Sequence, residues 1–84
     1  TLNILCRALL LIFKDEGEND TGKVNVFVDG HYKMTADPRI NGWLHCNTAI
    51  LFSEAESREH IVEILPAPGE EKKKFTILGF GYVL

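Results

Sequence analysis

Three histidines, two serines and two cysteines are the residues of this chain that could support catalysis, and none stands in a catalytic pattern. The sequence has no Gly-x-Ser-x-Gly motif, which would place a nucleophilic serine on a sharp turn. Ser53 and Ser57 both fall in one polar segment. His45 and Cys46 are adjacent, and adjacent side chains of a strand point to opposite faces, so they make a poor nucleophile–base pair. The sequence therefore predicts no enzymatic activity of its own.

Metal-ligating residue types are present, but their spacing is irregular. His31, His45 and Cys46 do not follow the ligand spacing of a structural zinc site. The acidic residues between positions 15 and 20 resemble a calcium loop only in composition, because the twelve-residue EF-hand pattern is absent. A solvated loop is the favoured interpretation, with a calcium site as the weaker alternative. We expect no cofactor.

The two cysteines are too few for a disulfide scaffold. Cys6 lies in an apolar run, which favours a buried free thiol. A Cys6–Cys46 bridge stays as the alternative, because only geometry decides it.

Aromatic side chains are the better candidates for a functional site. Trp43 and Tyr32 lie in or beside an irregular middle segment of the chain. Exposed aromatic faces can stack on flat ligand surfaces such as sugar rings, so both residues are predicted ligand contacts. The competing interpretation is that Trp43 covers the core from its loop, since aromatic residues dominate core burial.

Composition bounds the class of protein. Eighty-four residues make one domain, residues 1–84, and 45% hydrophobic with 25% charged residues is ordinary for a globular protein. Nine basic and twelve acidic residues give a net charge of −3, and a nucleic-acid-binding protein would be expected to carry a basic excess. The apolar run 4–13 is too short to span a bilayer and lacks a signal-peptide pattern. We therefore expect neither nucleic acid nor a membrane as partner. The chain begins with Thr1 and opens and closes in apolar runs, as an excised domain or a processed chain would.

Strand patterns occupy most of the chain. Residues 1–13 read as a strand covered on both faces, with its even-numbered residues sharing one face and a helix as the competing interpretation. Residues 23–29 alternate strictly, and Asp29-Gly30 then predicts a hairpin into a strand at 31–35. Further strands are expected at 48–52, 60–65 and 75–84, with a polar crossing at 53–58. Five or six such strands predict an all-β, antiparallel β-sandwich or partial barrel.

The closing stretch, residues 59–84, is predicted to be a strand pair. A short charged link that contains proline and glycine separates its two strands. The predicted core residues of this pair are Val62, Ile64, Phe75 and Ile77.

The same stretch carries a family resemblance. Glu59-His-Ile-Val-Glu-Ile64, Gly69-Glu-Glu71 and Lys74-Phe-Thr-Ile-Leu-Gly-Phe-Gly81 appear in that order, after Val24-Asn-Val-Phe-Val-Asp-Gly30 and Gly42-Trp43. In this combination the chain resembles the jelly-roll accessory domain of bacterial SGNH-hydrolase (GDSL-type esterase/lipase) proteins. It departs from that pattern at Ile61, where the family usually has threonine. The opening strands of a full jelly roll are missing or reduced to residues 1–13.

The resemblance implies a non-catalytic, jelly-roll-like β-sandwich module, complete or truncated, in architecture like a carbohydrate-binding module. It implies an adjacent SGNH-type catalytic domain as partner, and a role in positioning a carbohydrate or acylated substrate. No catalytic residue carries over, because the family's catalytic serine and histidine lie in the other domain. The alternative function is a structural module that forms a homodimer or packs on a partner domain without a small ligand.

Trp43→Ala tests the ligand interpretation of the middle segment. If Trp43 stacks on sugar, retention on polysaccharide is lost while the circular dichroism spectrum and the unfolding transition stay those of the parent chain. Loss of folding would instead support the core interpretation.

Overall fold

The fold is one antiparallel β-sheet. The computed structural model describes residues 1–15, 21–39 and 45–84. The strands, in the order β3-β2-β4-β1-β5 across the sheet, are bounded as β1 (Leu2–Asp15), β2 (Val24–Val28), β3 (His31–Ala36), β4 (His45–Pro66) and β5 (Ile77–Val83). The described residues contain no helix, which confirms the all-β antiparallel prediction. Two packed sheets, which would define a sandwich or jelly roll, are not seen in them.

The hairpin of β2 and β3 forms where Asp29-Gly30 predicts it. Asp29 has φ 52° and Gly30 has φ 82°, so both turn residues adopt the left-handed conformation. Asparagine, aspartate and glycine tolerate that conformation best, and two such residues close a turn that matches the twist of the flanking strands. The prediction of a hairpin is confirmed.

β1 is a strand, and the helical alternative for residues 1–13 is wrong. Its buried face changes parity along its length, because Cys6 is buried in the first half whereas Leu9 and Leu11 are buried in the second. The register with β4 shifts between Cys6 and Ala8. An irregularity of this kind turns the following side chains to the other face. The expectation that even-numbered residues share one face along the whole strand is therefore wrong beyond Arg7.

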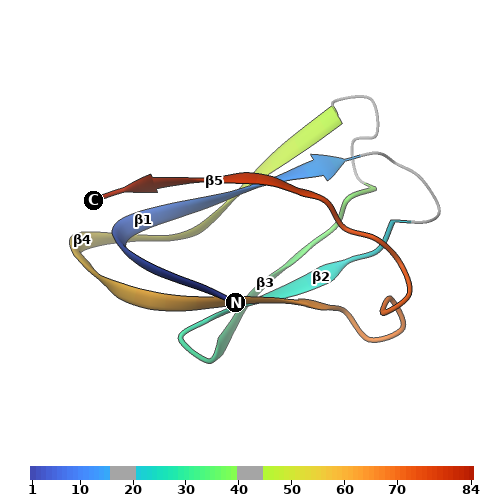
Figure 1. Ribbon diagram of the computed structural model, residues 1–84, viewed down its shortest axis with the longest axis horizontal. Helices are drawn as coiled ribbons and strands as arrows, with labels where there is room; N and C mark the ends of the chain where they lie inside the picture. The colour runs from blue at the N-terminus through green and yellow to red at the C-terminus, as the bar shows by residue number, and fades with distance from the viewer. Residues whose placement is uncertain (16–20, 40–44) are drawn as a thin grey trace.

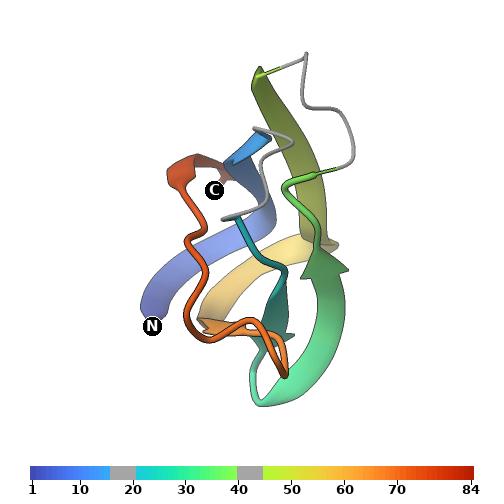
Figure 2. The same cartoon turned by 90° about the vertical axis from the view of Figure 1, so that its right-hand side faces the viewer.

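β4 is one long strand of 22 residues rather than two short strands and a crossing. The residues expected to cross, 53–58, stay extended as part of it. Cys6 lies opposite Arg58 and Ala8 lies opposite Ser53, so four residues of β4 bulge out against Arg7 alone. The polar composition that predicted a loop instead marks this wide bulge. β1 and β4 bend together there, as Figures 1 and 2 show.

β5 does not pair with β4, so the predicted closing strand pair is wrong. β5 pairs with β1, which lies between it and β4. The segment before β5 is attached by hydrogen bonds from Lys14 N to Thr76 O (2.9 Å) and from Gly22 N to Lys74 O (3.0 Å). β5 therefore lies beside the second half of β1 and not beside β4.

The core lies on the concave side of the bent sheet. Its buried hydrophobic residues come from four strands and are Cys6, Leu9, Leu11, Phe13, Val24, Val26, Ala36, Leu51 and Val62. Of the residues predicted for the closing pair, Val62 is buried, Ile64 and Phe75 pack against the core, and Ile77 is 42% exposed. Phe75 stacks on Phe13 with ring centroids 5.2 Å apart, so the segment before β5 covers part of the core.

Leu11→Ala should destabilise the protein by about 2–5 kcal/mol, because a fully buried leucine leaves a cavity when truncated. Leu5→Ala is the matched control, since Leu5 lies on the same strand and is 54% exposed. It should change the unfolding free energy by less than about 0.5 kcal/mol. Urea unfolding measures both, and equal losses would contradict the burial of the second half of β1.

Candidate functional site

Of the two predicted ligand contacts, the structure places Tyr32; Trp43 lies outside the described residues. Tyr32 is the second residue of β3, one residue beyond the hairpin turn, and is 59% exposed. Its ring meets the ring of Phe27 on β2 edge to face, with centroids 6.0 Å apart and an interplanar angle of 74°. An aromatic pair of this geometry holds the exposed ring in a defined orientation.

A chain of hydroxyl groups also fixes Tyr32. The Tyr32 hydroxyl lies 2.7 Å from Oγ1 of Thr35, which donates to Oδ1 of Asn25 at 2.7 Å. Since Thr35 has one hydroxyl hydrogen and gives it to Asn25, Tyr32 must donate to Thr35. The phenol oxygen of Tyr32 therefore keeps its acceptor capacity for a ligand.

A polar hollow of about 400 Å³ adjoins this ring. Besides Tyr32, its charged and titratable lining residues are Asp29, His31, Lys33, Glu54, Arg58 and His60. Val28, Leu51 and Phe52 complete the lining. The hollow thus offers cationic donors and anionic acceptors next to an exposed aromatic face.

Asp29 connects the hairpin turn to β4. Its backbone N–H donates to the carbonyl of Ile61 at 2.8 Å, and its Oδ1 accepts from the N–H of Ile61 at 2.9 Å. These two bonds hold the turn beside β4 one residue beyond the last paired residues, Val28 and Val62. The residue type that permits the turn is therefore also the one that anchors it.

His60 is buried, 2% exposed, between two carboxylates. Its Nδ1 lies 2.6 Å from Oδ2 of Asp29, and its Nε2 lies 2.7 Å from Oε1 of Glu54. An ionised carboxylate only accepts hydrogen bonds, so both ring nitrogens must donate. With both carboxylates ionised, the arrangement fits a ring that carries a proton on each nitrogen. The ring of Phe52 lies over it at 4.1 Å between centroids.

Arg58 completes a charge-balanced cluster, formed by Asp29, Glu54, Arg58 and His60. Arg58 donates to both carboxylate oxygens of Glu54, at 3.3 and 3.1 Å, and its Nη2 lies 3.9 Å from Oδ2 of Asp29. When His60 is protonated, the two negative charges of the carboxylates balance the two positive charges of Arg58 and His60. This balance lowers the free-energy cost of placing charge beside a buried ring. Hydrogen bonds from Arg58 and then His60 lower the pKa of Glu54. The bond from the Ile61 N–H and then the bond from His60 lower the pKa of Asp29.

His60 is not placed to activate a nucleophile in this cluster. Both nitrogens of His60 face carboxylates, so neither faces a serine or cysteine that it could activate. The carboxylates of Asp29 and Glu54 lie on opposite sides of the ring. Among the described residues, no group of three or more histidine, cysteine or carboxylate side chains is arranged to hold a metal ion.

Both cysteines are free, and Cys6 is buried as predicted. Burial raises the pKa of the Cys6 thiol, which lowers its reactivity. Cys46 lies opposite Lys14, eight residues along β1 from Cys6, a strand length of roughly 25 Å. The alternative of a Cys6–Cys46 bridge is therefore wrong.

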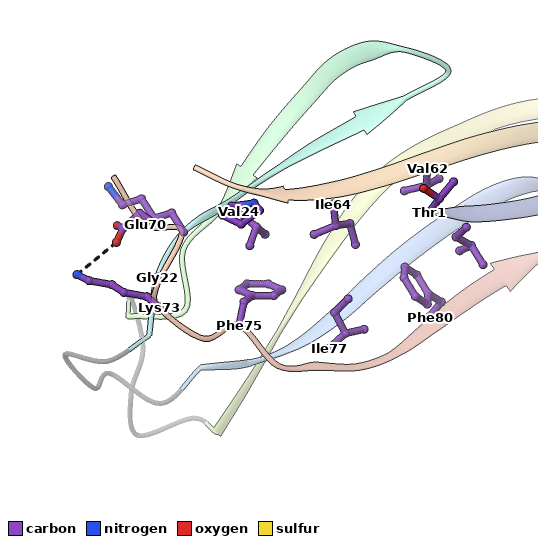
Figure 3. A pocket seen from close by; sticks show the side chains of 13 residues that line it. Thr1, Gly22, Val24, Val62, Ile64, Glu70, Lys73, Phe75, Ile77 and Phe80 are labelled. Carbon is purple, nitrogen blue, oxygen red and sulfur yellow. Dashed lines mark ion pairs between the residues drawn. The ribbon is translucent and has the colours of Figure 1, made fainter. Parts of the chain in front are cut away.

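A second hollow, of about 450 Å³, is apolar and lies on the concave side of the sheet. Figure 3 shows Val24, Ile64 and Val62 facing Phe75, Ile77 and Phe80 across it. Glu70 and Lys73 form an ion pair of 3.2 Å at one end. The hollow is a part of the core region that the described side chains leave unfilled. No helix in the described ranges has the length and apolar character needed to cross a membrane.

Sequence reasoning missed His60, Glu54 and Arg58 as members of one site. A signal for His60 was present, because it shares strand parity with Val62 and Ile64, which were expected to share one face. That parity placed a histidine in line with the core residues. Nothing in the pattern of residues 53–58 indicated that Glu54 turns back to His60 or that Arg58 pairs with Glu54.

Acidification should destabilise the protein through this cluster. Asp29 and Glu54 have folded-state pKa values below their ordinary values of 3.8 and 4.5, so their stabilisation is present above those values and is lost as the pH falls through the folded ones. The double variant Asp29→Asn/Glu54→Gln should therefore flatten the loss of unfolding free energy below pH 4.5. Urea unfolding across this range measures it.

Glu59→Gln is the control, since Glu59 is exposed on the same strand outside the cluster. The loss of unfolding free energy that remains at acid pH in the double variant includes a contribution from Glu70, whose pKa is lowered by Lys73. A double variant that loses as much unfolding free energy on acidification as the parent chain would show that the cluster does not stabilise the fold.

No family model, no curated protein and no solved structure matches this chain. The relation to SGNH-type hydrolases therefore stays a prediction from the sequence, and the site must be interpreted from its own geometry.

Proposed function

We propose that this chain is a non-catalytic β-sheet module that contacts a carbohydrate through Tyr32 and the polar hollow beside it. The observation that carries the proposal is the exposed ring of Tyr32, held by Phe27 and Thr35 at the rim of a hollow with donors and acceptors. A sugar ring presents an apolar C–H face together with hydroxyl groups that both donate and accept. A fixed aromatic face next to mixed polar groups is complementary to both features.

Different residues of the polar hollow would contact these two features of a sugar. Tyr32 offers the stacking face, while Lys33 and Arg58 offer donors to hydroxyl oxygens. Arg58 is exposed, with 63% of its side chain accessible, although it also pairs with Glu54. Asp29 and Glu54 each keep about a third of their side chain accessible and can accept from hydroxyl groups. A neutral polar ligand fits this set better than an ion of either sign, because the cluster is already charge-balanced.

The proposed setting is an SGNH/GDSL-type esterase or lipase of bacterial origin, with the module beside the catalytic domain. The support is the ordered set of sequence motifs that ends in Lys74-Phe-Thr-Ile-Leu-Gly-Phe-Gly81. In this setting the module positions a carbohydrate or acylated substrate and the chemistry takes place in the neighbouring domain. A Gly-Asp-Ser block and an Asp-x-x-His motif in the parent gene would support this setting, and their absence would contradict it.

Tyr32→Ala should weaken binding to the responsive polysaccharide by at least about tenfold, a loss of about 1.4 kcal/mol, because the stacking face is removed. Affinity electrophoresis over a polysaccharide panel, followed by NMR titration with the best oligosaccharide, measures the loss. Tyr32→Phe keeps the ring and should retain most of the affinity.

Tyr82→Ala is the matched control, because Tyr82 is 58% exposed and stands on β5, outside the lining of the polar hollow. It should leave affinity unchanged. Equal loss from both alanine variants, or no binding by the parent chain to any polysaccharide, would contradict the proposed function.

A further inference from the structure

β5 forms one edge of the sheet. Within the described ranges it pairs only with β1, as the outermost strand of the sheet. An outermost strand exposes a row of backbone N–H and C=O groups that can pair with another strand. Figure 1 shows β5 running along the margin of the molecule with its carboxyl end near the C-terminus.

The opposite outermost strand, β3, carries the protection that such edges normally have. Lys33 is exposed on β3, and charged edge residues, lysine above all, oppose pairing with other chains. The stretch 75–84 contains no charged residue. Its exposed large hydrophobic residues are Ile77, Leu78, Tyr82, Val83 and Leu84. The two sheet edges therefore differ, and only β5 lacks a charge.

We propose that β5 pairs antiparallel with β5 of a second copy of this chain, across a two-fold axis. The occupant of this edge must bring a free strand edge of similar length and no charge opposite the apolar side chains. β5 itself meets both requirements. A two-fold interface uses the same patch on both copies, so one self-complementary strand is sufficient to build it.

The register follows from the strand bounds. Ile77–Val83 has Phe80 as its midpoint, so full overlap of two antiparallel strands places the axis at Phe80. Leu78 then lies opposite the partner's Tyr82, and Gly79 lies opposite the partner's Gly81. Paired aliphatic and aromatic side chains stabilise neighbouring strands. Lys74 of each copy falls beyond the overlap at opposite ends, so the two lysines do not face each other.

Gly79 provides the test position. A Cβ at Gly79 would meet no atom within 4 Å, and the residue needs no left-handed conformation, so the monomer accepts a side chain there. Gly79→Lys adds a charge in the middle of the proposed interface. Its dissociation constant for self-association should rise at least about tenfold, because charged edges oppose strand pairing. Analytical ultracentrifugation over a concentration series measures it.

Ile50→Lys is the matched control, since Ile50 is 67% exposed on β4, two strands away from β5. It should dimerise as the parent chain does. Leu78→Lys, at a residue 54% exposed, gives a second charged variant in case Gly79→Lys fails to fold, and circular dichroism reports folding for all of them.

Hydrogen exchange identifies the interface directly. Amide groups of β5 should become more protected as the concentration of the parent chain rises, and those of Gly79→Lys should not. A parent chain that stays monomeric at millimolar concentration overturns the proposal. So does a dimer that both lysine variants on β5 leave intact. Saccharide binding through Tyr32 is independent of these results, because β5 does not line the polar hollow.

Discussion

The bend shared by β1 and β4 is the constraint on which the rest of the structure depends. Arg7 alone stands against four residues of β4, so both strands must turn at this point. The turn moves the buried face of β1 from Cys6 to Leu9 and Leu11, and this lets a single sheet enclose a core on its concave side. A straight sheet of the same strands would leave that face open to water.

The bend also creates the polar site. The residues bulging from β4 begin with Glu54, which returns to His60 on the same strand, and His60 in turn reaches Asp29 in the hairpin turn. The charges of the cluster therefore join the bulge to the hairpin. Burying a histidine ring costs free energy unless its nitrogens have hydrogen-bond partners, and carboxylates at 2.6 and 2.7 Å supply both partners of His60. The position of Tyr32 at the rim of the hollow follows from where this hairpin is held.

Local sequence signals predicted what local chemistry controls. Asp29-Gly30 predicted its hairpin because the turn depends on two residues that adopt positive φ. Alternation predicted most strands and the burial of Val62. Pairing partners were not predictable, because alternation does not reveal which neighbour a strand takes, and β1 separates β4 from β5. The prediction of a crossing at residues 53–58 was wrong for a related reason, because a bulge and a loop can have the same polar composition. Tyr32 was predicted as a ligand contact from its residue type and stays a prediction, whereas the cluster depends on contacts such as that between Asp29 and His60, 31 residues apart.

The two outermost strands of the sheet, β3 and β5, differ in charge and in the kind of contact that they favour. At the β3 edge, Tyr32 is surrounded by Lys33, Asp29 and Arg58, and their hydration and charge suit a polar ligand while they oppose strand pairing. At the β5 edge, the uncharged stretch 75–84 offers apolar side chains and a strand that pairs on one side only within the described ranges, which favours pairing with another strand. One sheet can then serve both roles at once, because β2, β4 and β1 separate its two edges. Pairing through β5 would leave the polar hollow of each copy at the outer edge of a continuous sheet, so the two proposed contacts do not compete.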